Sequence, residues 1–361
     1  MDRPGHRPSD PTERLARLTD AAAEALEDGR AEEALARAEE ALALGPRSVP
    51  ALHLRGDALA DLGRIAEARE AFERALGPGK DDPELLAGAA DFLVNRLPDD
   101  EAEEIDLERG LELARRGSRR ARRTGDPALA ADLALLEGQA LGKLGRPDEA
   151  LARLAAAARD APDRADVRLE QGIALYELCR FEEAQAALLQ AERLDPEEPW
   201  VEHYLGLVAE RQGRADEARR RLDRARRRAP DEFPRPVALS PAAFDAAVED
   251  ALAELPEDVR RYLSNVAISV EDLPSDDDLG ASDPPLSPAI LGRFRGAPYG
   301  QKASMDPWSH LPSSIVLYQV NLERFARSRA ELIEQIRVTL VHEVGHFLGL
   351  DEDELYTRGL E

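Results

Sequence analysis

Most of the chain places hydrophobic residues at the spacing of amphipathic helices, and this pattern repeats every 34 residues. A repeat of that length is typical of a helix–turn–helix unit that stacks on copies of itself. The repeating columns are Ala150, Ala184 and Ala218; Gly138, Gly172 and Gly206; Leu154, Leu188 and Leu222; Ala157, Ala191 and Ala225; and Pro162, Pro196 and Pro230. The pattern predicts a helical solenoid over residues 15–232, preceded by a disordered segment at residues 1–14.

Each column has a physical reason. Small residues are expected where the two helices of a unit approach closely, because a larger side chain would push them apart. Glycine is expected in the turn between helices, where φ is often positive. The turn column contains Gly29, Gly63, Gly145 and Gly213, with Cys179 in place of glycine in one unit. Proline follows the second helix and ends it.

One unit, at about residues 83–130, is longer than the others, and we assign the surplus to an acidic linker at residues 98–106. The same unit contains the basic run ARRGSRRARR at residues 114–123, and a second basic run lies at residues 218–228. Such a run can bind nucleic acid or an acidic peptide, but a solvated helix face is the interpretation we favour.

The repeat ends near Pro230, and Pro-rich residues 233–240 are interpreted as a linker to a different domain, residues 241–361. A helix is predicted at residues 240–255, and residues 274–288 are predicted to be a mobile acidic loop. Alternating or β-branched segments predict strands at residues 266–273, 290–296 and 313–320. The predicted fold is therefore mainly α, a helical solenoid followed by a small α+β domain.

The last helix is predicted from about Ser328 to Leu348, with apolar residues over a broad face, which indicates a central buried helix. It carries the motif HEVGH. His342 and His346 lie one turn apart on the same face, so both imidazoles can bind one zinc ion. Glu343, next to the first histidine, is placed to act as the general base toward water.

Gly349 is expected to end this helix and to let the following acidic segment turn back toward the metal. We assign Glu352 as the third ligand, with Asp351 as the alternative. Two histidines and one carboxylate leave the fourth position of a zinc site open for water, as catalysis requires. His310 lies in a predicted loop, where a lone histidine is seldom a ligand.

Charge and composition limit the classes of partner and the compartment that we expect for this chain. The 361 residues carry a net charge of −25, which disfavours nucleic acid and anionic membrane surfaces. The polar, Pro-rich start MDRPGHRPSDPTERL is unlike a secretory leader, and the chain has one cysteine and no long apolar run. We therefore expect a cytoplasmic protein without a disulfide.

The repeats resemble the tetratricopeptide (TPR) family, most clearly at LGRIAEA (62–68) and LGRPDEA (144–150). The resemblance implies a scaffold that binds a peptide or protein partner on the concave face formed by the first helix of each unit. The alternative is that the repeat array is only a rigid extension of the chain and binds no partner.

The last third resembles the small bacterial minimal-zincin metallopeptidases, through VAISVED, LGRF, IVLYQVNLERF and VHEVGHFLGLDEDEL. The resemblance implies a compact zincin fold with two histidines and an acidic third ligand, and peptidase activity. The sequence departs from larger zincins because the only internal methionine, Met305, precedes the helix, so no methionine turn underlies the metal.

These features predict a zinc-dependent peptidase that hydrolyses peptide bonds with metal-activated water, while the repeats recruit a substrate or partner. IVLYQV (315–320) is our candidate for an edge strand that aligns an extended substrate. Tyr318, Tyr356 and Arg293 are candidates for stabilising the oxyanion. The alternative is a protein-binding scaffold whose zincin domain holds metal but is weakly active or inactive, and a metal-free HEVGH helix is a third hypothesis.

Overall fold

The computed structural model describes residues 10–98, 102–263, 266–296, 313–351, 354–355 and 357. Contacts between residues divide the chain into two compact units. The first comprises Met1–Leu175 with Glu182–Pro196, and the second comprises Tyr176–Phe181 with Glu197–Glu361. Across the described residues, none of the helices has both the length and the apolar character that a membrane crossing requires.

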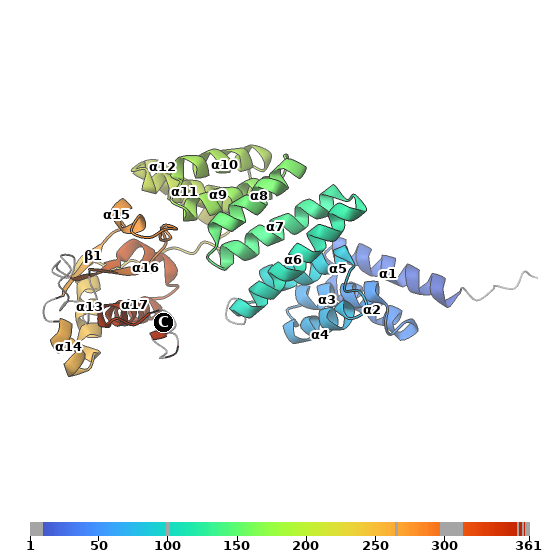
Figure 1. Cartoon of the computed structure of the whole chain (residues 1–361), viewed down its shortest axis with the longest axis horizontal. Coiled ribbons are helices and arrows are strands. Elements are labelled where there is room, and N and C mark those ends of the chain that lie inside the picture. The colour runs from blue at the N-terminus through green and yellow to red at the C-terminus, as the bar shows by residue number, and fades with distance from the viewer. Residues whose placement is uncertain are drawn as a thin grey trace, which may run out of the picture. The chain divides into compact units, whose positions relative to one another are not determined.

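The first unit is built of helices that pack in antiparallel pairs, as the solenoid prediction requires (Figure 1). Its elements are α1 (Pro11–Glu27), α2 (Ala31–Leu44), α3 (Val49–Asp61), α4 (Ile65–Leu76), α5 (Pro83–Asp91), the π-helix η1 (Phe92–Arg96), α6 (Glu104–Thr124), α7 (Pro127–Lys143), α8 (Pro147–Asp160), most of α9 (Ala165–Glu177) and nearly all of α10 (Phe181–Leu194). Residues 11–14, expected to be disordered, form the first turn of α1, because the Asp10 carboxylate caps it by accepting from the Thr12 amide.

The small-residue columns have the roles that the sequence predicts. A Cβ atom at Gly138 would lie 2.6 Å from the Leu154 side chain, and one at Gly172 would lie 2.5 Å from Leu188. The turn glycines have φ between 67° and 72°, and Cys179 adopts a similar φ of 57°. The 34-residue pattern is therefore a consequence of close helix packing and left-handed turns.

The long unit differs from our expectation in where its extra residues lie. Helix α6 has 21 residues, whereas the second helix of a regular unit, α8, has 14. The surplus therefore lies partly in a longer helix and not only in the linker. The basic run on α6 pairs with acidic side chains of neighbouring segments. Arg120 pairs with Asp81, in the turn before α5, at 2.7 Å, and Arg115 pairs with Glu149 of α8 at 3.6 Å. These pairs fit the solvated-face interpretation.

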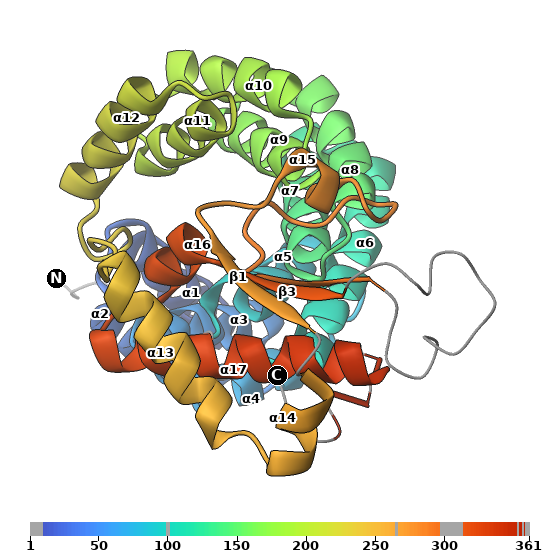
Figure 2. The same ribbon diagram turned by 90° about the vertical axis from the view of Figure 1, so that its left-hand side faces the viewer.

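The second unit combines two repeat helices with an α+β fold. Its elements after the end of α9 are α11 (Pro199–Arg211), α12 (Ala215–Arg228), α13 (Pro241–Glu254), α14 (Glu257–Leu263), β1 (Ala267–Glu271), α15 (Asp276–Leu279), β2 (Gly292–Arg295), β3 (Ser314–Tyr318), α16 (Gln319–Phe325) and α17 (Arg329–Leu348). The strand order is β1-β3-β2, with β1 parallel and β2 antiparallel to β3. Figure 2 shows α13 and α17 packed together below the sheet.

Strand β3 is the central strand, so the prediction that IVLYQV is a substrate-aligning edge strand is wrong. Ile315, Val316 and Leu317 are completely buried. Such a continuous apolar run is typical of a strand that is covered on both faces. Within the described part of the sheet, β1 and β2 form the edges.

The acidic segment at residues 274–288 is more ordered than a mobile loop. Ser275 and Asp278 form a reciprocal cap at the start of α15, and Asp278 is only 3% exposed. Its carboxylate accepts hydrogen bonds from Arg295 at 2.6 and 2.7 Å and from Arg293 at 3.2 Å. These charge-assisted bonds tie the segment to β2.

Candidate metal centre

Helix α17 is held firmly beneath the sheet. Ser328 caps it by accepting from the Glu331 amide at 3.2 Å, so its bounds agree with those predicted. Leu332, Ile336, Leu340 and Phe347 on this helix are completely buried. The HEVGH motif occupies the last turns of a helix whose position is fixed by packing.

The two histidines converge. The Nε2 atoms of His342 and His346 lie 3.1 Å apart, and the ring planes are nearly perpendicular. Two nitrogens bound to one tetrahedral zinc at about 2.0–2.1 Å are about 3.3 Å apart, so the pair fits a shared zinc ion. His346 Nδ1 lies 3.2 Å from the carbonyl oxygen of Leu350. With Nδ1 as the donor, Nε2 keeps its lone pair for the metal.

The turn after α17 supplies that carbonyl. Gly349 has φ 94° and ψ 19°, a left-handed conformation that favours glycine. The Leu350 amide donates to the Gly345 carbonyl at 3.0 Å, and the Gly349 amide donates to the His346 carbonyl at 3.0 Å. The predicted helix end at Gly349 is therefore confirmed, and it places the Leu350 carbonyl beside His346.

The acidic segment turns back along the helix. Leu355 is completely buried and packs on Gly345, where any Cβ atom would collide with it. Asp351 begins a short helical turn, because its carboxylate accepts from the Glu354 amide at 2.9 Å. In return, Glu354 accepts from the Asp351 amide at 3.2 Å. The Asp351 carboxylate thus has a capping role.

Glu352, our preferred third ligand, lies outside the described residues, as do His310 and Tyr356. Within the part of the chain that the structure describes, no group of three His, Cys, Asp or Glu side chains could hold a metal ion. The described part of the candidate ligand set thus comprises the two histidines and Asp351, the alternative third ligand.

Glu343 is 6% exposed and lies against β2 through a glycine that sequence reasoning missed. A Cβ atom at Gly292 would lie 2.6 Å from Thr339 Cγ2 and 3.2 Å from Glu343 Cγ. Gly292 therefore lets α17 approach the strand closely. The sequence did contain a signal for this contact, namely a glycine near the start of a predicted strand. Glycine in a strand often marks a place where another segment approaches the backbone closely.

The motif residues line a cavity of about 510 Å³. Its lining includes His342, Glu343 and His346 of the motif and the apolar side chains of Leu286, Ile290 and Phe294. Arg293 also lines the cavity, but its guanidinium donates to the Asp278 carboxylate and carbonyl. Tyr318, another candidate for stabilising the oxyanion, is not among the described residues that line this cavity. It is buried near Asp278 and Arg295, and burial raises its pKa.

Comparisons with known families agree with the two-part architecture. Residues 263–360 match the model of the zincin-like metallopeptidases. Residues 19–83 and 135–199 match a tetratricopeptide repeat model. No curated protein matches the chain.

Two solved structures share the repeat fold. One is pilF of Pseudomonas aeruginosa, with 16% identity over 61% of this chain and 94% of that chain, and a TM-score of 0.51. The other is PilW, described as a widely conserved type IV pilus biogenesis factor, with 18% identity over 60% of this chain and 94% of that chain, and a TM-score of 0.52. At these identities the similarity concerns the fold alone.

Proposed function

The chain joins tetratricopeptide repeats to a zincin-like metallopeptidase domain, and from this we propose that it is a zinc-dependent peptidase whose repeats recruit a substrate or partner. The observation that carries the proposal is the 3.1 Å approach of the two Nε2 atoms in a cavity that Glu343 also lines. A cavity with convergent histidines beside a carboxylate is suited to hydrolysis.

His342 and His346 would hold the zinc ion, with Glu352 as the third ligand and Asp351 as the alternative. When bound, zinc supplies a Lewis acid that makes water more acidic and polarises a carbonyl group. The Glu343 carboxylate would accept a proton from the attacking water and pass it to the leaving amine. The Leu350 carbonyl would keep His346 oriented, as is usual for histidine ligands.

An extended substrate would align along β2. This strand lies at an edge of the described sheet, and its residues Gly292 and Phe294 line the cavity. A peptide added to a strand edge gains main-chain hydrogen bonds, and its side chains alternate between the two faces. Strand β2 therefore takes the role that the sequence reasoning gave to β3.

The test compares the purified wild type with Glu343→Gln. We expect both proteins to bind one zinc ion per chain by plasma emission spectroscopy, and His342→Ala to lose it. Cleavage of a broad peptide library should fall by roughly 10² to 10⁴-fold in Glu343→Gln, the usual contribution of general acid–base catalysis. Equal cleavage by wild type and Glu343→Gln would sink the peptidase proposal. Stoichiometric zinc with no cleavage by the wild type would support the alternative, a scaffold with an inactive zincin domain.

A further inference from the structure

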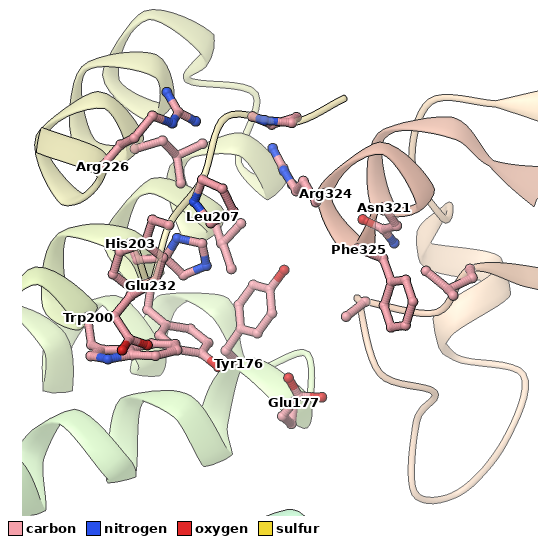
Figure 3. A pocket seen from close by; sticks show the side chains of 17 residues that line it. Tyr176, Glu177, Trp200, His203, Leu207, Arg226, Glu232, Asn321, Arg324 and Phe325 are labelled. Carbon is pink, nitrogen blue, oxygen red and sulfur yellow. The ribbon is translucent and has the colours of Figure 1, made fainter. Parts of the chain in front are cut away.

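A second cavity, of about 340 Å³, lies in the second unit and shares no described lining residue with the cavity at the HEVGH motif. Figure 3 shows that its lining side chains come from the end of α9, from α11 and α12, from the segment before α13, and from α16. Helices α9 and α11 are first helices of their repeat units, and in this repeat architecture the first helices carry the concave binding surface. The cavity is therefore placed where a recruited peptide would run.

The base of this cavity is aromatic. Phe233 contacts Trp200 at a ring distance of 4.7 Å and stacks on His203 at 4.5 Å. Tyr176 packs edge-on against Tyr204 at 5.7 Å. Rings held in such a cluster form a rigid apolar surface that binds another apolar group at a small cost in side-chain entropy.

Two large hydrophobic side chains of the lining remain open to solvent. Trp200 is 38% exposed and Phe325 is 55% exposed. Phe325 projects from α16 toward the space beside Tyr176 (Figure 3). Apolar surface that gathers around a hollow is a mark of a binding site, whereas scattered exposed side chains are not.

His203 keeps the base uncharged at neutral pH. Burial, together with the nearby positive charges of Arg324 and Arg226, lowers the pKa of His203 to about 4. The imidazole is therefore neutral under physiological conditions, and the base accepts an apolar group without a charge beneath it.

The arginines at the rim of the aromatic cavity are paired with carboxylates, whereas one glutamate at the rim is not paired with any described residue. Arg324 is neutralised by Glu210, with hydrogen bonds of 2.6 and 2.7 Å, and Arg226 by Asp223 at 2.7 Å. Glu232 is exposed, and within the described part of the chain no hydrogen bond or ion pair engages it. The available charge at the rim is therefore negative, which favours a basic residue in the ligand.

This cavity and the candidate metal centre share a wall. Leu286 and Ile290 face the metal-site cavity, whereas Ala289 and Leu291 line the aromatic one. The Asn321 amide holds the shared segment by donating to the Pro288 carbonyl at 2.9 Å and the Ile290 carbonyl at 2.8 Å. A group that enters the aromatic cavity therefore contacts the segment that also shapes the metal site.

We infer that the aromatic cavity is a recruitment site for an extended peptide that carries a bulky apolar side chain next to Lys or Arg. The inference rests on the proposed function, in which the repeats recruit a substrate or partner. The apolar side chain lies on the aromatic base, and the basic neighbour meets Glu232. Binding at this site requires neither zinc nor hydrolysis.

The test uses the full chain with Glu343→Gln and Trp308→Phe, so that no peptide is cleaved and Trp200 is the only tryptophan. Tryptophan fluorescence is titrated with three blocked pentapeptides: Gly-Lys-Phe-Lys-Gly, Gly-Lys-Ala-Lys-Gly and Gly-Glu-Phe-Glu-Gly. We expect the first peptide to bind at least tenfold more tightly than either of the others. Equal affinities for the Phe and Ala peptides would overturn the inference.

Two variants locate the binding. Phe325→Ser should weaken the Lys-Phe-Lys peptide at least fivefold, and Glu232→Gln should reduce the preference over the Glu-Phe-Glu peptide. Leu44→Ser is the matched control, because Leu44 is 40% exposed and lies on α2, in the first unit. Binding that survives Phe325→Ser unchanged would also contradict the inference.

The outcome separates the two proposals. Selective peptide binding by a protein whose wild type shows no hydrolysis would leave this inference standing and reject the peptidase. Hydrolysis by the wild type, with no preference among the three peptides in the titration, would reject the recruitment site alone.

Discussion

At the scale of single residues, Gly349 connects a helix end to the chemistry of His346. Its φ of 94° is unfavourable for a residue with a Cβ atom, and the turn that it forms presents the Leu350 carbonyl to His346 Nδ1. Gly349→Ala should therefore lower the free energy of unfolding by about 1 kcal/mol and weaken zinc binding by roughly tenfold. Urea unfolding and a zinc titration against a chelator measure the two effects.

Gly349→Asn is the control for this prediction, because asparagine tolerates the left-handed conformation better than alanine does. It should retain zinc affinity close to that of the wild type. If Ala and Asn at position 349 bind zinc equally well, the turn does not position His346.

Gly292 has an equally local role on the opposite side of the cavity. A valine there would meet Thr339 and Glu343 on α17 and the Val316 carbonyl on β3. Gly292→Val should cost about 2 kcal/mol of stability, and it should reduce cleavage by displacing Glu343. Gly142→Ala is a control of opposite sign, because no atom lies within 4 Å of its Cβ position and alanine favours a helix by about 0.5–1 kcal/mol. A fully stable and active Gly292→Val protein would contradict this account.

The sequence was sufficient to place some of these residues in the site but not others. His342, Glu343, His346 and Gly349 lie within a single helix and its end, so helical periodicity and turn chemistry place them. Gly292 reaches the site only through the pairing of β2 with β3 and the packing of α17, which a linear pattern does not contain. The capping role of Asp351 depends on an amide three residues later, and the charge pattern alone suggested only a ligand.

At the scale of secondary-structure elements, Asp278 fastens the segment before β2 to that strand. Arg295 and Ser275 donate hydrogen bonds to its carboxylate and hold its pKa well below the usual range, although burial acts in the opposite direction. Removal of one partner from a buried ion pair leaves charge uncompensated. Asp278→Asn should therefore lower the free energy of unfolding at pH 7 by about 3 kcal/mol.

The stabilisation by the Asp278 carboxylate should depend on pH in a definite direction. Because the pKa of Asp278 is lower in the folded state than in the unfolded chain, the carboxylate stabilises the fold above the unfolded pKa of about 4. The stabilisation is lost as the pH falls toward the lower folded pKa. The difference between wild type and Asp278→Asn in urea unfolding should shrink from pH 4 to pH 2. A constant difference over that range would show that the ionised carboxylate is not the cause.

The sequence largely predicted where the strands begin and end, but it did not predict which strands lie next to one another. The predicted strands at 266–273, 290–296 and 313–320 contain β1, β2 and β3. The order β1-β3-β2 depends on pairing between segments that are distant in the chain, so the edge strand was assigned wrongly. The acidic run at 274–288 was interpreted as a mobile loop because its arginine partners lie on β2, outside the run.

At the scale of the whole molecule, the second unit joins repeat helices to the fold that carries the HEVGH motif. Arg211 at the end of α11 donates to the Pro274 carbonyl at 2.6 Å and pairs with Asp276 at 2.9 Å. The Cys179 thiol in the repeat turn donates to the Leu286 carbonyl at 3.5 Å. Leu286 also lines the metal-site cavity, so the repeats support one of its walls directly. Repeat periodicity alone does not predict this support, because it arises from contacts with a segment more than 60 residues away.

Arg211 provides the test of that support. Its side chain is only 7% exposed, and its guanidinium lies over the Phe181 ring at 5.5 Å, so methionine can replace its buried stem while removing both polar contacts. In Arg211→Met, residues 274–291 should exchange amide hydrogens at least tenfold faster, since their tie to α11 is lost. Zinc content should stay unchanged, because His342 and His346 are held by α17. Arg214→Met is the matched control, since Arg214, the residue just before α12, pairs with Glu217 in the first turn of that helix. Unchanged exchange in Arg211→Met would mean that the zincin fold orders this wall without the repeats, and equal acceleration in both variants would point to a general loss of stability.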